Sequence, residues 1–355
     1  MVSENPALPE SSRKALDEIL ERGRRAAGRL ESERGYRRIY MGGAPTAGLG
    51  SPKSDIDLFV VLDSRAPTSS EQLAFEGARV DIEYLELDAL RSLVDTCTAF
   101  RSTSEDMEQI GYATRSRLDS LTRFVLGEIL LDQDGALRDL LDRWADRRAD
   151  YQRLLVARHA TDVENLGDDV TGALLNEDLP GAEYQSREAL YRAAEAYLCG
   201  RGDYYINTKW LWTKWARTVG DELGAAVSGI LRDPRLPSAG DAVSRNLWLA
   251  QDLVAMAATG YRYRPVASAD PEHCRRQPAD SLVPTSDSYL VTQQTASQAV
   301  ELSRQGVLLW GVAHGRTEQE ALRLVQAQLS ADGIGVPIEE IGGYYRLLRD
   351  HRLIA

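Results

Sequence analysis

The feature that most constrains this chain is a pair of short segments in which acidic and apolar residues alternate, SDIDLFVV and VDIEYL. Side chains two positions apart on a strand leave the same face. Asp55 and Asp57 therefore share one face of the first segment, and Asp81 and Glu83 share one face of the second. The residues between them are apolar and are expected to face a core. If the two strands pair, three or four carboxylates come together on one side of a sheet.

Carboxylates crowded in this way resist ionising together, because each negative charge disfavours the next. Two Mg²⁺ ions would remove that cost, bridge the carboxylates to a nucleoside triphosphate and stabilise an in-line displacement. The alternative is a row of solvated acids, which the run LFVVL disfavours because it is typical of a strand buried on both faces. Gly42 and Gly43 lie a short loop ahead of Asp55, where glycine lets backbone approach phosphate closely and Ser54 can donate a hydrogen bond.

The segment GGAPTAGLGSPKSDIDLFVV, followed by VDIEYL, resembles the polymerase-β-like nucleotidyltransferase superfamily. The resemblance implies a mixed sheet with flanking helices, bound Mg²⁺, ATP or another nucleoside triphosphate as co-substrate, and transfer of a nucleoside monophosphate with release of pyrophosphate. It also implies roles for individual residues. Gly43 and Ser54 match the phosphate-binding positions, and the metal ligands match Asp55, Asp57 and Asp81.

Two assignments stay open within that resemblance. Glu83 takes the place of Asp81 if the strand register slips by two residues. The segment GRGDYYINTKWLWTKWART resembles a stretch that supplies a lysine to the triphosphate in small-molecule nucleotidyltransferases, including the aminoglycoside-modifying ones, and Lys209 matches that lysine best. Lys214 lies on another side of a helix through this segment. In the alternative interpretation, the tryptophans are core residues and both lysines reach solvent.

At 355 residues the chain is long enough for two or three domains. We expect a nucleotidyltransferase catalytic domain over 1–101, a helical partner domain over 102–265, a linker rich in Pro and Ser over 266–287, and a small domain over 288–355. Helical spacing favours helices in LTRFVLGEILL, GALRDLLDRWADRRADYQRLLVARHA, SREALYRAAEAYL and DAVSRNLWLAQDLVAMAATGY. The predicted fold class is therefore α+β.

The tail from Ser288 to Ala355 resembles a PqqD-like winged-helix unit, on the residues GVLLWGVAHGRTEQEALRLVQ and IEEIGGYYRLLRDHRLI. The resemblance implies an element that holds a precursor peptide. We expect such a peptide to add as an extended strand at an edge near Tyr289–Val291. The alternative is a small domain that packs against the enzyme and binds nothing.

Composition limits the partners. A net charge of -12 argues against duplex nucleic acid, which usually demands a basic surface. The N-terminus lacks an apolar signal core and no apolar run is long enough to span a bilayer, so we expect a cytoplasmic protein with no membrane partner. Three separated cysteines and four histidines suggest neither a disulfide framework nor a zinc cluster.

These observations predict a Mg²⁺-dependent, adenylyltransferase-like enzyme. It would move a nucleoside monophosphate, AMP from ATP by preference, onto a hydroxyl of a small-molecule natural product such as an antibiotic, or of a peptide. One alternative is a toxin-like nucleotidyltransferase that modifies tRNA, which the acidic balance and the long helical region disfavour. Another is a non-catalytic nucleotide sensor that binds a peptide, which the trio of acids disfavours.

Overall fold

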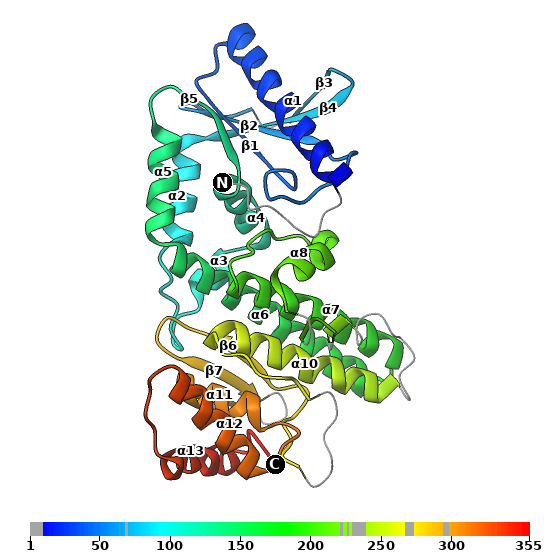
Figure 1. Ribbon diagram of the computed structural model, residues 1–355, viewed down its shortest axis with the longest axis vertical. Coiled ribbons are helices and arrows are strands. Elements are labelled where there is room, and N and C mark those ends of the chain that lie inside the picture. The colour runs from blue at the N-terminus through cyan, green and yellow to red at the C-terminus, as the bar shows by residue number, and fades with distance from the viewer. Residues whose placement is uncertain are drawn as a thin grey trace. The chain divides into compact units, whose positions relative to one another are not determined.

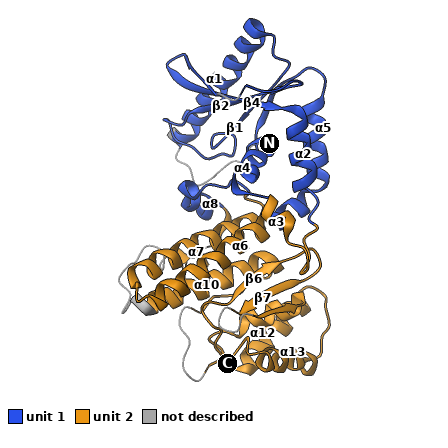
Figure 2. Ribbon diagram, turned by 180° about the vertical axis from the view of Figure 1, so that it is seen from behind, with its two compact units in different colours: residues 1–100, 113–154, 204–217 blue, residues 101–112, 155–203, 218–355 orange. Residues whose placement is uncertain are grey.

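The computed structural model describes residues 10–67, 70–220, 223–225, 227–228, 239–266, 273–293 and 298–355. The chain divides by its internal contacts into two compact units (Figure 2). Unit 1 combines residues 1–100, 113–154 and 204–217, and unit 2 combines residues 101–112, 155–203 and 218–355. Unit 1 is therefore assembled from three separate pieces of the chain.

A five-stranded sheet forms the centre of unit 1, in the order β3-β4-β2-β1-β5 (Figure 1). Its strands are β1 (Arg38–Gly42), β2 (Ile56–Leu62), β3 (Glu71–Phe75), β4 (Ala78–Glu86) and β5 (Glu128–Asp132). β2 and β4 run parallel and the other neighbouring pairs are antiparallel, so the sheet is mixed. The helices of this unit are α1 (Glu10–Arg34), α2 (Leu87–Cys97), α4 (Arg115–Val125), α5 (Ala136–Asp146), the start of α6 (Arg148–Leu175), the short 3-10 helix η1 (Thr208–Trp210) and α8 (Leu211–Thr218).

Helix α1 lies along one face of this sheet (Figure 1). Its apolar side chains, Leu20 and Leu30 among them, are buried in one core with Ile56, Leu58 and Val60 of β2. Because side chains alternate along a strand, the residues between these three leave the opposite face. The alternation predicted for the first acidic segment is confirmed, and it leaves the acids on the side of the sheet away from α1.

One expected helix is wrong in its second half. In LTRFVLGEILL, α4 ends at Val125 and the following residues form β5, antiparallel to β1. A Cβ at Gly127 would lie 2.7 Å from the carbonyl oxygens of Met41 and Arg123, so the chain turns there where only glycine fits. The apolar run that follows is too short to distinguish helix from strand by its spacing. The next predicted helix is also divided at Arg147, between α5 and α6.

Unit 2 combines long helices with a small antiparallel sheet. Its elements are α3 (Glu108–Tyr112), most of α6, α7 (Leu179–Gly200), α10 (Ala239–Thr259), β6 (Ser281–Pro284), β7 (Tyr289–Gln293), β8 (Gln298–Leu302), α11 (Arg304–Ala313), α12 (Glu318–Ala331) and α13 (Ile338–Asp350). α7 and α10 lie side by side (Figure 1). With the mixed sheet of unit 1, these elements confirm the predicted α+β class.

The strand order β6-β7-β8 changes the expectation for the tail. β7 has a partner on each side, so the predicted free edge at Tyr289–Val291 is wrong. The neighbouring strand β8 is largely exposed and lies at the edge. β6 falls inside 266–287, the range expected to be a linker, and its four residues are buried. Within the described ranges, no helix has both the length and the apolar character that crossing a membrane requires.

Candidate functional site

The parallel pairing of β2 and β4 brings the predicted acids together. Asp57 lies opposite Asp81, and Phe59 lies opposite Glu83, so Asp81 is the cross-strand neighbour of Asp57. Asp55 directly precedes β2. By strand alternation, the side chains of Asp57 and Asp81 both leave the face away from α1. We call Asp55, Asp57 and Asp81 the carboxylate cluster.

Two members of the carboxylate cluster are largely buried, since the side chain of Asp57 is 22% exposed and that of Asp81 is 18% exposed, whereas that of Asp55 is 49% exposed. Burial raises the pKa of Asp57 to about 6; Arg123 opposes this shift, and the negative charges of Glu83, Asp81 and Asp55 add to it. A carboxyl group held in such surroundings lowers the stability of the fold, which is typical of a functional site.

An arginine from α4 fixes one oxygen of Asp57. Arg123 donates from Nη1 to Oδ2 of Asp57 at 3.1 Å and from Nε to Oδ2 of Asp119 at 2.9 Å. The side chain of Arg123 is only 25% exposed. Because it is held by two carboxylates, it limits the rotamers that Asp57 can adopt.

A second arginine occupies the other side of the cluster. Arg79 of β4 donates from Nε and Nη2 to the two oxygens of Asp81, at 2.9 and 2.7 Å. Its Nη2 atom also lies 4.0 Å from Oδ2 of Asp55. The side chain of Arg79 is 55% exposed, so it faces solvent more than Arg123 does.

The glycine pair at the end of β1 touches Asp57 directly. Gly42 lies opposite Asp57 in the β1–β2 pairing. Gly43 has a φ of +95, and a Cβ there would meet Oδ2 of Asp57 at 2.6 Å. A Cβ at Gly42 would also be crowded, by a ring carbon of Phe59 at 2.9 Å and the carbonyl oxygen of Arg123 at 3.0 Å. Only glycine fits at these two positions, and the backbone of the turn therefore lies against the carboxylate.

The loop between β1 and β2 is held by contacts from within and from α8. Ser54 accepts a hydrogen bond at Oγ from the backbone N–H of Ser51, at 2.9 Å, which leaves its own O–H free to donate elsewhere. From α8, Arg217 donates from Nη1 to the carbonyl oxygen of Ala47 at 2.9 Å. The segment 204–217 is thereby attached to the loop that carries the glycines.

The two candidate lysines of that segment have different surroundings. Lys214 is fully buried and donates from Nζ to the carbonyl oxygen of Tyr205 at 2.5 Å, so it holds the backbone of the segment. Burial raises the pKa of Tyr205 to about 12, and the charge of Arg123 opposes the shift. Lys209 is exposed, and its ammonium lies 5.1 Å from the centre of the Trp210 ring. A role for Lys209 at the triphosphate stays a prediction.

The oxygen donors of the carboxylate cluster are of the type that Mg²⁺ prefers. In the described residues, no three His, Cys, Asp or Glu side chains already converge as a metal site. Mg²⁺ does not need such a preformed set, because it is usually held by one or two carboxylates together with substrate phosphates and water. Asp57 and Asp81 lie opposite each other on parallel strands. They fit that requirement when the arginines bonded to them leave carboxylate oxygens accessible.

Sequence reasoning did not identify either arginine. A signal existed for Arg79, because it lies two residues before Asp81 and therefore shares its face of β4. For Arg123, 66 positions from Asp57, the spacing of four residues from Asp119 on a helix was the only local signal. That spacing predicts an ion pair and says nothing about a third partner.

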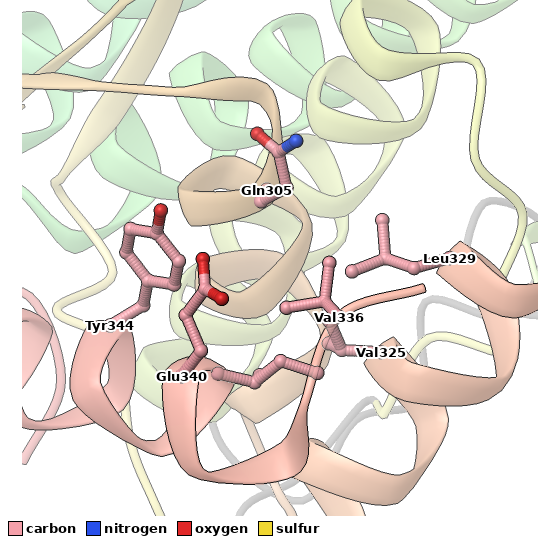
Figure 3. Close-up of a pocket in the computed structure, with 7 residues that line it drawn as sticks. Gln305, Val325, Leu329, Val336, Glu340 and Tyr344 are labelled. Atoms are coloured by element: carbon pink, nitrogen blue, oxygen red, sulfur yellow. The ribbon is translucent and has the colours of Figure 1, made fainter. Parts of the chain in front are cut away.

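A small pocket lies among the last three helices of unit 2 (Figure 3). Polar groups come from α11 and α13, and the apolar side is formed by α12, α13 and the segment before α13. The lining residues are Gln305, Val325, Leu329, Val336, Glu340, Ile341 and Tyr344. The lining is mainly apolar, with polar groups at Gln305, Glu340 and Tyr344.

No protein-family model and no curated protein sequence matches this chain. Among solved structures, the chain is similar to a nucleotidyltransferase-like protein from Exiguobacterium sibiricum 255-15, with a TM-score of 0.38 and 12% sequence identity. The similarity covers 68% of this chain and 77% of that one. Similarity at this level is too low to assign a fold family or a function, so the functional argument depends on the geometry of the site.

Proposed function

We propose that this protein is a metal-dependent nucleotidyltransferase, which moves a nucleoside monophosphate from a triphosphate such as ATP onto a hydroxyl group. One observation carries the proposal. Asp57 lies opposite Asp81 on parallel strands, and the backbone of Gly43 lies against the carboxylate of Asp57. This arrangement combines oxygen ligands for a metal with a turn that phosphate oxygens can approach.

The residues of the chain have separable roles in this proposal. The glycine turn and the hydroxyl of Ser54 bind phosphate oxygens, and Arg123 holds Asp57 in one orientation. Bound Mg²⁺ would neutralise the phosphates and favour attack on the α-phosphorus. The alternative third carboxylate, Glu83, has the aromatic Phe59 as its cross-strand neighbour. The register thus favours Asp81 as the third acid.

The order of the strands suggests from which side the acceptor approaches the nucleotide. Gly43 follows β1, Asp55 and Asp57 lie at the start of the central β2, and Asp81 is on β4 beyond it. In an in-line displacement, the attacking and leaving oxygens lie on opposite sides of the phosphorus. With pyrophosphate leaving on the side of the glycine turn, the acceptor hydroxyl approaches from the side of β4. We therefore propose that the acceptor is recognised on the β4 side of the site.

The acceptor in this proposal is a small molecule or a peptide. Two features of unit 2 favour a peptide: the exposed edge strand β8, and the pocket among α11, α12 and α13. An extended peptide could pair with the edge strand through its backbone while a side chain enters the pocket. Titration of a candidate precursor peptide into wild type and the pocket variant Tyr344→Ala tests this, and equal affinities would contradict it.

The activity itself is tested by pyrophosphate release from the four common nucleoside triphosphates with Mg²⁺ and a panel of hydroxyl acceptors. We expect release with ATP that needs both the metal and an acceptor, and none in the Asp57→Asn variant. Nucleotide binding without turnover across the panel would favour a sensor. Release stimulated only by tRNA, with a steep salt dependence, would favour the RNA-modifying alternative.

A further inference from the structure

Arg79 is the residue whose position the proposed reaction leaves unexplained. Its guanidinium satisfies both oxygens of Asp81, at 2.9 and 2.7 Å, and reaches to 4.0 Å from Asp55. A carboxylate oxygen that already accepts a hydrogen bond from a guanidinium is a poor metal ligand. The metal ion and the N–H donor compete for the same lone pairs of that oxygen. In this arrangement, Asp81 is therefore not available to a metal.

The strand register explains why Arg79 lies there. Arg79 and Asp81 are two positions apart on β4 and share its face, and the β2–β4 pairing begins with Ile56 opposite Val80. Arg79 therefore continues the same row, level with Asp55. Its partner on β3 is Ala74, which has no polar group to offer. The backbone thus places one cation beside two acids of the cluster.

We propose that Arg79 is the resident counter-cation of the carboxylate cluster, and that loading of the divalent metal requires Arg79 to release Asp81. The proposal rests on the metal site of the proposed function. Its consequence is a coupling between two ligands: free metal binds weakly because it must displace a cation. Metal that arrives with a triphosphate binds more tightly, because the phosphates provide ligands that do not depend on Asp81.

A comparison with Arg123 supports the idea that Arg79 can release Asp81 to a metal ion. Arg123 is 25% exposed and is held at both ends, by Asp119 and by one oxygen of Asp57. Arg79 is 55% exposed, and the partners of its guanidinium are acids of the cluster. Asp81 itself is 18% exposed, but the guanidinium of Arg79 is solvated, and an ion pair with a solvated partner contributes little free energy. Of the two arginines, Arg79 is thus the one that can leave without disturbing the fold.

The test measures metal binding directly and does not require turnover. Mn²⁺, which accepts the same oxygen ligands as Mg²⁺, is titrated into the full-length protein and followed by its electron paramagnetic resonance signal. We expect Arg79→Gln to bind free Mn²⁺ about two- to fivefold more tightly than wild type. Arg79→Lys keeps the charge but loses the two-point contact, and should lie between them. Arg91→Gln is the matched control, because Arg91 is an exposed arginine paired with Asp88 on α2.

A second measurement tests whether the increase in Mn²⁺ affinity of Arg79→Gln depends on this site and on bound nucleotide. In the double variant Arg79→Gln with Asp57→Asn, the gain should disappear. With a non-hydrolysable ATP analogue present, the affinity of wild type for Mn²⁺ should rise by a larger factor than that of Arg79→Gln. Thermal melts establish that each variant is folded.

The outcomes separate this proposal from the proposed function. If wild type binds Mn²⁺ and Arg79→Gln binds it equally or more weakly, the counter-cation role is overturned and the metal site stands. If neither protein binds Mn²⁺ with or without the analogue, the metal site is overturned and this proposal with it. If Arg79→Gln alone binds free Mn²⁺, the counter-cation role is supported in its strongest form.

Discussion

Replacement of Asp57 by asparagine should abolish nucleotide transfer and yet stabilise the metal-free protein at neutral and alkaline pH. Burial raises the pKa of Asp57 to about 6, from an ordinary value of 3.8. A shift of this size corresponds to about 3 kcal/mol of differential stability. Asparagine has nearly the same shape and cannot ionise, so it removes that cost. The pKa of about 6 already includes the opposing charge of Arg123, and partial exposure of the side chain to solvent reduces the expected gain to about 1–2 kcal/mol.

The sign follows from proton linkage. Because the pKa is higher in the folded protein, the folded state keeps its proton between about pH 4 and pH 6 while the unfolded state loses it. The free energy of unfolding of wild type therefore falls as pH rises through this window, and stays lower above it. The advantage of Asp57→Asn should be full at pH 8 and should vanish towards pH 4.

The assay is a set of thermal melts in EDTA at pH 4 and pH 8, beside pyrophosphate release with Mg²⁺ at pH 8. Asp95→Asn is the control, since Asp95 is an exposed acid paired with Arg143 and should change neither result. A lower melting temperature of Asp57→Asn at pH 8 would refute the reasoning on burial. Transfer at a rate near that of wild type would refute the assignment of Asp57 as a metal ligand.

Three further outcomes are expected. Gly43→Ala should weaken ATP binding, measured by titration calorimetry, because the new Cβ meets Oδ2 of Asp57 at a residue with φ +95; affinity equal to wild type would contradict the contact. Lys214→Met should lower the stability to urea by about 1–3 kcal/mol, because the carbonyl oxygen of Tyr205 loses its charged donor and keeps the N–H of Asn207; unchanged stability would mean the bond contributes nothing. Burial raises the pKa of Asp280 to about 7, and its oxygens have no hydrogen-bond partner among the described residues. Asp280→Asn should therefore raise the melting temperature at pH 8 and leave it unchanged at pH 4. An equal change at both pH values would exclude ionisation of Asp280 as the cause.

Local patterns in the sequence predict much of this fold because they report local forces. The alternation in IDLFVVL and ARVDIEYLE is enough to identify β2 and β4, since each side of these strands has a distinct environment. The start of α12 can also be predicted from the sequence, because Thr317 and Glu320 form a capping box. These elements are determined by residues within a few positions of one another.

Contacts between distant segments could not be predicted in the same way. The pairing of Asp57 with Arg123 joins two segments with no shared pattern. β6 was missed because Pro and Ser surround it, and β8 was not predicted either, so the one strand expected in the tail, near Tyr289–Val291, had free edges. The metal ligands remain a prediction, whereas the structure adds the arginines that hold those acids.

The three-piece construction of unit 1 has a consequence for the order in which the protein is made. The bond from Arg217 to Ala47 spans 170 positions, so the acids and the glycine turn leave the ribosome long before the segment that fastens their loop. Synthesis proceeds from the N-terminus, and long-range contacts form late because closing a long loop costs chain entropy. A nascent chain that ends before residue 204 carries every acid of the cluster but lacks the third piece of unit 1. Nucleotide binding should therefore begin only after residue 217 of 355 has emerged.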